Sequence, residues 1–84
     1  MQIKHERCAG IDVHKKTVVV CCLWVDEQGK DQRETRTYGT TTRELLNLCE
    51  WLASLEITHV AMESTGEYWK PVYNILESSF EVMV

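Results

Sequence analysis

Two acidic residues, Asp12 and Glu63, stand at the ends of two short apolar runs. Asp12 ends CAGID within residues 8–16, and Glu63 ends VAME within residues 60–69. Apolar and β-branched runs of this kind favour strands, so each carboxylate is expected near the end of a strand, just before a turn. Two such strands lying side by side would bring both acids into one shared site.

Two neighbouring carboxylates repel each other unless a divalent cation neutralises both. Their hard oxygen atoms favour Mg²⁺ or Mn²⁺, which proteins commonly bind through one or two carboxylates together with phosphate oxygens. Two such ions about 3.5–4 Å apart can activate a water or hydroxyl and stabilise the leaving oxygen of a phosphodiester. Asp12 and Glu63 are therefore predicted to be metal ligands and catalytic residues of a nuclease-type site, which further acids would complete. The alternative is that both acids simply solvate turns.

Three strands are predicted in the first half of the chain. Residues 7–13 and 17–25 are rich in β-branched and apolar side chains, and the polar turn at residues 14–16 joins them as a hairpin. A second turn containing Gly29 leads to residues 33–39, where threonines alternate with larger side chains. That alternation is typical of an exposed strand.

Two helices are predicted in the second half. Thr41 and Glu44 fit a capping box that starts the first helix. The apolar stripe with which this helix would pack on the sheet consists of Leu45, Leu48, Cys49, Leu52 and Leu55. Pro71 lacks an amide hydrogen and is tolerated only near a first turn, so the second helix is expected to begin around residues 67–70 and to continue to about Ser78.

Residues 57–62 and 80–84 supply the remaining strands, and the former is so continuously apolar that burial on both faces is predicted. The order β-β-β-α-β-α-β, with a helix crossing over to each parallel strand, predicts an α/β fold with a mixed five-stranded sheet of order 3-2-1-4-5. The first and fourth strands are parallel neighbours in this sheet. Asp12 and Glu63 are then expected about one strand spacing apart, ~5 Å.

The length, composition and net charge limit the classes of protein to which the chain can belong. A chain of 84 residues is expected to form one small domain, residues 1–84, with a marginal core, and its 44% hydrophobic and 26% charged residues are ordinary for a folded domain. The net charge of −4 has the wrong sign for a domain that binds nucleic acid alone through a basic face. It is compatible with a catalytic module whose acids hold cations.

Neither export nor membrane insertion is expected. The longest uncharged apolar stretch, residues 18–25, is far shorter than the ~18 residues of a membrane span, and no signal peptide is recognisable, so a soluble cytoplasmic protein is predicted. In that reducing compartment the cysteines are expected to be free thiols that pack as small hydrophobes. They form no CxxC pair, which argues against a zinc site.

Two longer motifs carry a family resemblance. GIDVHKKTVVVC at residues 10–21 and AMESTGEYWKPVYNILE at residues 61–77 resemble the N-terminal part of the DEDD, RuvC-like transposases of the insertion-sequence-110 family, which are related to the Piv-type DNA invertases. The resemblance spans essentially the whole chain. It implies a ribonuclease H-like fold in which Asp12 is the first and Glu63 the second acid of the family's Asp-Glu-Asp-Asp set, both ligands of catalytic magnesium.

The same resemblance implies partners and an activity. Enzymes of this family cut and rejoin DNA strands, are associated with an element-encoded guide RNA and work as oligomers, and a distant C-terminal domain supplies a nucleophilic serine. The acids after Glu63 are Glu67, Glu77 and Glu81, and none takes the place of the last two aspartates of the set. The chain is therefore expected to be a fragment truncated before the C-terminal helix of the fold and catalytically silent by itself.

Two other classes of protein stay open. A non-catalytic module for self-association or partner binding would fit the acidic charge and an unfinished sheet edge at residues 80–84. A fragment of a ribonuclease H-like ATPase is disfavoured, because such ATPases follow the first aspartate with a glycine-rich phosphate loop where this chain has His14, Lys15 and Lys16. His14 itself is interpreted either as a turn residue or as a neighbour of the metal or phosphate.

Overall fold

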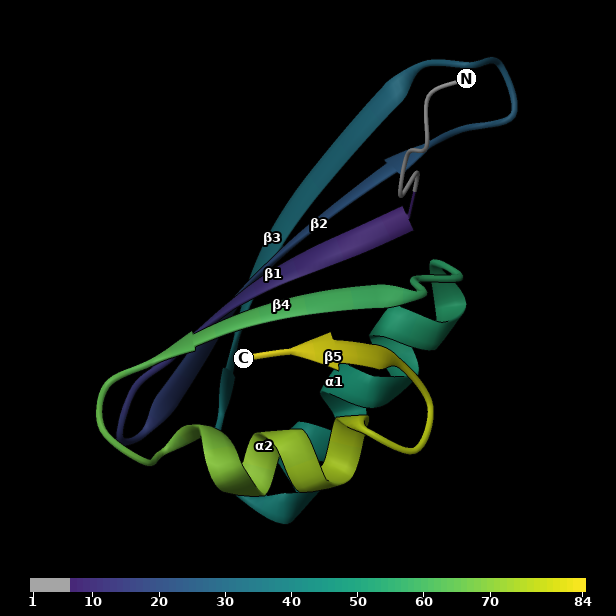
Figure 1. Ribbon diagram of the computed structural model, residues 1–84. Helices are drawn as coiled ribbons and strands as arrows, with labels where there is room; N and C mark the ends of the chain where they lie inside the picture. The colour runs from purple at the N-terminus through teal and green to yellow at the C-terminus, as the bar shows by residue number, and fades with distance from the viewer. Residues whose placement is uncertain (1–6) are drawn as a thin grey trace.

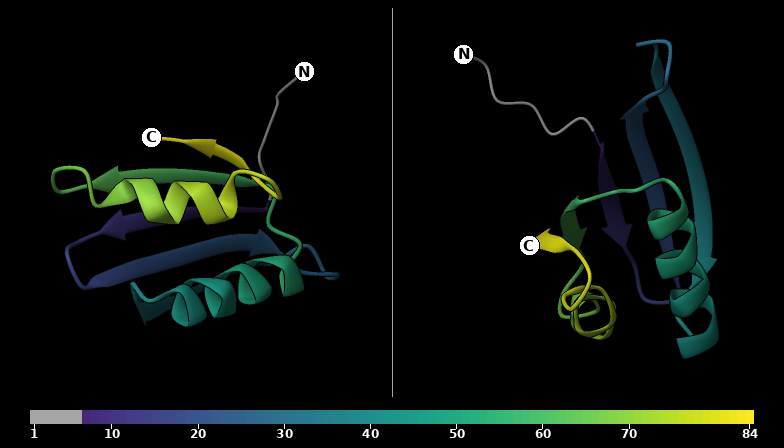
Figure 2. Two further views of the ribbon diagram at one scale, coloured as in Figure 1. Left: turned by 90° about the horizontal axis from the view of Figure 1, so that it is seen from below. Right: turned by 90° about the vertical axis from the view of Figure 1, so that its right-hand side faces the viewer.

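The computed structural model describes residues 7–84 and shows a five-stranded sheet with both helices on one of its faces (Figure 1). Viewed from below, the helices lie in front of the sheet (Figure 2, left). The elements follow one another as β1 (Arg7–Val13), β2 (Thr17–Val25), β3 (Asp31–Gly39), α1 (Thr42–Ser54), β4 (His59–Ser64), α2 (Trp69–Leu76) and β5 (Glu81–Met83).

The sheet has the order β3-β2-β1-β4-β5, as predicted from the sequence. β1 pairs antiparallel with β2, and β2 pairs antiparallel with β3, so the first half of the chain is a meander. β4 pairs parallel with β1 and β5 pairs parallel with β4, with α1 and α2 as the two crossover helices. The α/β fold class and the mixed sheet are thus confirmed, and the arrangement is consistent with a ribonuclease H-like fold.

The start of α1 follows from its capping residues. Thr41 is extended, with φ −70° and ψ 157°, and its hydroxyl accepts a hydrogen bond of 3.2 Å from the amide of Glu44. The Glu44 carboxylate reaches back past the N-cap residue and accepts a hydrogen bond of 3.0 Å from the amide of Gly39, whereas a capping box has this carboxylate bonded to the amide of the N-cap residue itself. Because Gly39 ends β3, this contact ties the edge strand to the helix that follows it.

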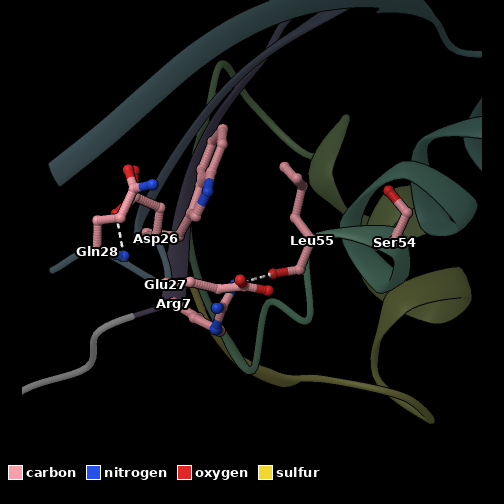
Figure 3. Close-up of a pocket in the computed structure, with 7 residues that line it drawn as sticks. Arg7, Asp26, Glu27, Gln28, Ser54 and Leu55 are labelled. Carbon is pink, nitrogen blue, oxygen red and sulfur yellow. Dashed lines mark hydrogen bonds between the residues drawn. The ribbon is translucent and has the colours of Figure 1, made fainter. Parts of the chain in front are cut away.

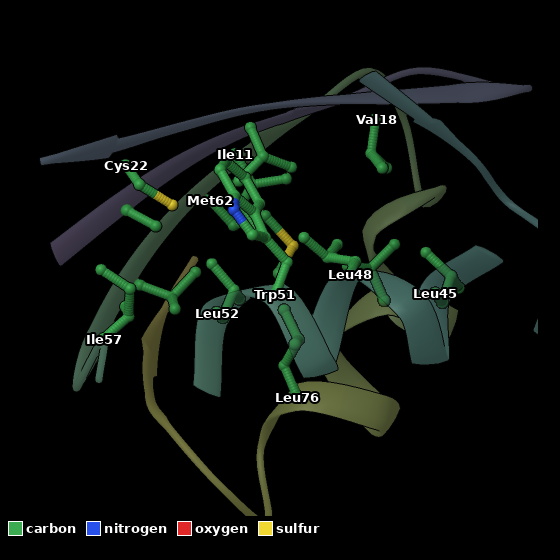
Figure 4. Close-up of a cluster of buried hydrophobic side chains, with 14 of the residues drawn as sticks. Ile11, Val18, Cys22, Leu45, Leu48, Trp51, Leu52, Ile57, Met62 and Leu76 are labelled. Carbon is green, nitrogen blue, oxygen red and sulfur yellow. The ribbon is translucent and has the colours of Figure 1, made fainter. Parts of the chain in front are cut away.

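The core lies between the sheet and the helices (Figure 4). Alternate residues of β1, β2 and β4 point toward the helices, and the predicted stripe of α1 meets them. Trp51, which the sequence places beside the stripe, is also buried, at 7% exposure. The buried residues are Ala9, Ile11, Val13, Val18, Val20, Cys22, Leu45, Leu48, Trp51, Leu52, Ile57, Val60, Met62, Val72 and Leu76.

The fourth strand differs from its prediction in position and in environment. Residues 57–62 were predicted as the strand, but β4 begins at His59, because the amide of Ile57 bonds to the carbonyl of Leu52 and closes the end of α1. Burial on both faces is also wrong, since Ala61 and Glu63 are exposed on the face that carries no helix. Ala61 is apolar and lengthens the apolar run, but its side chain is small and can stay exposed to solvent at little cost in free energy.

The observed bounds of the remaining strands and of α2 differ from the predicted bounds by at most a few residues. β3 begins at residue 31 rather than 33, and β5 covers residues 81–83 of the predicted 80–84. α2 begins at Trp69, which places Pro71 in its first turn as predicted, and it ends at Leu76, before Ser78. Strand and helix ends are the places where pattern constrains the backbone least.

The core predicts a matched pair of stability effects on α1. Replacing Leu48, which is 0% exposed, by alanine is expected to lower the free energy of unfolding by about 2–5 kcal/mol, because it leaves a cavity under the sheet. The control Leu46→Ala changes a leucine of the same helix that is 51% exposed, and a loss below about 1 kcal/mol is expected. Urea unfolding followed by circular dichroism measures both; equal losses would contradict the packing described here.

Candidate functional site

The two predicted acids are partners in the parallel ladder between β1 and β4. The register pairs Asp12 with Glu63 directly, and neighbouring strands lie about 4.7–4.9 Å apart. Ile11 and Met62, which precede the two acids, are buried in the core, so both acids project from the opposite, helix-free face. The fold therefore brings together the two side chains that the sequence identifies.

Both acids line a shallow hollow of about 410 Å³ on the helix-free face of the sheet. Its lining includes Gly10 and Ala61, which are also register partners and precede the two acids by two residues, so they lie on the same face. A Cβ atom placed on Gly10 would meet no other atom within 4 Å, so the space above the strands is open. Small side chains here leave room for a ligand to approach the carboxylates.

His14 contacts one member of the acid pair. Its Nε2 atom lies 3.1 Å from Oδ2 of Asp12, and the two side chains are 49% and 61% exposed. The amide of His14 donates to the carbonyl of Thr17 at 2.8 Å, which fixes the turn between β1 and β2. His14 is therefore a turn residue, as one interpretation of the sequence has it, and it also contacts Asp12.

The pair fits a small divalent cation by its donor chemistry. Mg²⁺ and Mn²⁺ prefer oxygen ligands and keep several water molecules, so two exposed carboxylates beside open space suit them. The described part of the chain, residues 7–84, holds no group of three or more His, Cys, Asp or Glu residues arranged around a metal position.

The later acids lie elsewhere, as the sequence suggests. Glu67 pairs with Lys70 at the start of α2, and Glu77 caps the end of that helix. Glu81 lies on β5 opposite His59, at the far end of β4 from Glu63. None of the three joins Asp12 and Glu63.

A second hollow of about 400 Å³ lies at the other end of the sheet (Figure 3). Two of its charged residues bond to the backbone. The Arg7 guanidinium donates to the carbonyls of Leu55 at 2.7 Å and Val25 at 3.4 Å. The Asp26 carboxylate accepts hydrogen bonds from the amides of Lys30 and Gln28, and the first of these contributes most to lowering the pKa of Asp26. These contacts stabilise the fold and do not form a competing site.

Cys21 is a residue of the candidate site that sequence reasoning missed. It is the β2 register partner of Gly10 and lines the same hollow as the acids. Hydrogen bonds from Arg33 and then Thr35 lower the pKa of the Cys21 thiol. Its neighbour Cys22 faces the core, where burial raises the thiol pKa to about 12. Counting outward from the predicted turn at residues 14–16 pairs residue 13 with residue 17, which would set Val20 beside Gly10. The observed register is shifted by one residue, and this shift brings Cys21 beside Gly10.

A mixed five-stranded sheet of this order, with both helices on one face, is consistent with a ribonuclease H-like α/β fold. The family model of the DEDD transposases of the insertion-sequence-110 type, described as transposase, matches residues 9–84. The chain belongs to this transposase family. No curated protein matches it significantly. Within residues 7–84 neither helix is long and apolar enough to cross a membrane.

The cysteine environments predict an order of alkylation. At neutral pH iodoacetamide is expected to modify Cys21 before Cys22, because a lowered pKa gives more reactive thiolate and a raised pKa gives less. The rate at Cys21 should rise with pH around a midpoint that is lower than that of an unperturbed thiol, because the pKa of Cys21 is lowered. Arg33→Met should move that midpoint upward and slow the reaction at neutral pH. Peptide mapping by mass spectrometry resolves the individual cysteines.

The matched control for this experiment is Arg43→Met, which removes the same charge from an exposed position on α1. It should leave the profile of Cys21 unchanged. Faster alkylation of Cys22 than of Cys21, or equal effects of the two arginine substitutions, would contradict the described environment.

Proposed function

We propose that Asp12 and Glu63 jointly bind a catalytic Mg²⁺ or Mn²⁺ and form half of the acid set with which a transposase cleaves and transfers DNA strands. The observation that supports this most directly is the register of β1 and β4, which makes the two acids partners on an exposed face. The family match supplies the reaction class.

The chain's own residues have distinct parts in this proposal. Asp12 and Glu63 would hold the cation, and the hollow that they line together with the small residues Gly10 and Ala61 would give a DNA phosphate access. A cation bound there would neutralise negative charge that develops on the phosphate during cleavage. His14 positions the Asp12 carboxylate through its contact of 3.1 Å.

DNA is the proposed substrate and partner, and the local charge near the site is compatible with it. Lys15 and Lys16 are exposed in the turn that follows β1 and Asp12, so their ammonium groups are available to phosphates. The chain as a whole is acidic, with a net charge of −4, so these two cations and the bound metal would have to provide much of the attraction. The guide RNA associated with the family remains part of the proposal for the larger enzyme.

The acid set is proposed to be incomplete in this chain, which would then be catalytically silent by itself. The family's set has four acids, and in the described residues 7–84 no third carboxylate joins Asp12 and Glu63. Two carboxylates can bind one cation weakly, but they leave much of its coordination to water. The further acids and a serine-bearing domain are proposed to come from other parts of the enzyme.

Metal binding gives the first test. Addition of Mn²⁺ to the chain should broaden the NMR signals of residues around Asp12 and Glu63 before any others, because a paramagnetic ion relaxes nearby nuclei. Asp12→Asn or Glu63→Gln should each weaken binding by about tenfold or more, since each removes a charged oxygen ligand. Glu67→Gln is the matched control: it removes the same charge at an exposed acid outside the site and should have no effect.

Broadening centred elsewhere, or equal weakening by all three substitutions, would contradict the proposed site. The activity test uses supercoiled and branched DNA with Mg²⁺, and the chain by itself is expected to give no nicking above background. Robust cleavage that Asp12→Asn abolishes would show that the pair suffices for catalysis, and it would overturn the proposal of an incomplete acid set.

A further inference from the structure

β3 forms one margin of the sheet, and its outer edge offers unpaired backbone groups. In the order β3-β2-β1-β4-β5 it has β2 on one side and no strand of residues 7–84 on the other (Figure 2, right). It spans nine residues, Asp31–Gly39, and contains no proline. An edge of this length can pair with another strand unless its side chains prevent it.

The charges of β3 are already ordered within one chain. Arg36 and Glu34 point to the helix face, where Nε of Arg36 donates to the Glu34 carboxylate at 2.8 Å. The guanidinium carbon of Arg36 also lies 4.4 Å from the centre of the Trp51 ring. Both charged side chains remain partly exposed, at 48% for Arg36 and 43% for Glu34. They are therefore held in place but accessible to a further partner.

We propose that β3 pairs antiparallel with β3 of a second copy, around a two-fold axis that passes beside Thr35. In this register Asp31 faces Gly39 of the second copy, so all nine residues of each strand are paired. Glu34 then lies directly opposite Arg36 of the other copy, and this contact occurs twice. Opposite charges at directly facing positions stabilise an antiparallel pair.

Other antiparallel registers of the same edge either set like charges opposite each other or pair few residues. Centring the axis on Gln32, for example, places Asp31 opposite Arg33 but pairs only residues 31–33 of each strand. A two-fold axis perpendicular to the sheet keeps the helix faces on the same side, so the register can shift only in steps that retain the face of each residue. An axis beside Glu34 would place Glu34 of the two copies opposite each other. An axis beside Arg36 would place Arg36 of the two copies opposite each other. Parallel pairing in register would likewise place like charges side by side. The charge pattern therefore selects the register that also pairs the whole strand.

The opposite margin of the sheet is a weaker candidate. β5 has three residues, Glu81–Met83, and so offers few backbone hydrogen bonds to a second strand. Antiparallel pairing centred on Val82 would bring no opposite charges together. Self-association is accordingly assigned to β3, and it does not depend on the metal site proposed above.

The test uses two charge reversals on the full chain. Glu34→Arg and Arg36→Glu each place like charges opposite one another in the dimer, so each alone is expected to raise the dimer dissociation constant by about tenfold or more in sedimentation velocity. An equimolar mixture of the two variants should regain dimers, because each arginine then faces a glutamate of the other variant. Within each variant the intrachain pair stays broken, so this recovery reports contacts between chains.

Net charge does not account for recovery in the mixture, since the reversals change the chain from −4 to −2 or −6 and both variants remain negative. The matched control Glu50→Arg makes the same change on an exposed position of α1 and should leave the dissociation constant unaltered. Amide exchange of the unmodified chain supplies a second measurement that needs no variant: exchange in residues 31–39 should slow as concentration rises, while that in residues 81–83 should not.

A chain that stays monomeric at all accessible concentrations would overturn the proposal. So would dimers that resist both reversals, or a mixture that fails to regain dimers although circular dichroism shows both variants folded. If a variant does not fold, amide exchange of the unmodified chain still tests the proposal: exchange in residues 31–39 that does not slow as concentration rises would overturn it.

Discussion

The parallel ladder between β1 and β4 is the constraint on which the candidate site depends. It runs from the pair Cys8 and His59 to the pair Val13 and Ser64, and it places Asp12 opposite Glu63 near its end. A slip of one residue would turn one acid toward the helices, because successive side chains alternate between faces. Burial of the apolar side chains on the helix face fixes this register. The packing of the core therefore also determines where the two acids lie.

The hydrophobic core and the candidate site therefore lie on opposite faces of the sheet. The face toward α1 and α2 carries the core, whereas the opposite face combines exposed acids with the small residues Gly10 and Ala61. His14 and Cys21 border the acids from the hairpin side, one through a direct contact and the other through the register of β2. A cation at the pair would relieve the repulsion between two carboxylates that the backbone holds near each other. The family match shows that the chain carrying this acid pair belongs to the transposase family.

Much of this fold can be predicted from the sequence because its patterns are strong. The bounds of β1 and β2 agree with the prediction, since apolar runs and a polar turn delimit them. The shift of β4 by two residues depends on how α1 ends, through the bond from Ile57 to Leu52, which the sequence pattern does not encode. The bare face of β4 also escaped prediction, because a small apolar residue such as Ala61 tolerates solvent. Cys21 joined the site through cross-strand register, which single residues do not reveal.

The most direct measurement of the central claim is a crystal structure grown with Mn²⁺, in which the metal is located by its anomalous scattering. We predict a metal peak between the side chains of Asp12 and Glu63, with carboxylate oxygens of both residues about 2.0–2.2 Å from the ion. Carboxylates on opposite faces of the sheet, or a metal bound elsewhere while this pair points apart, would contradict it.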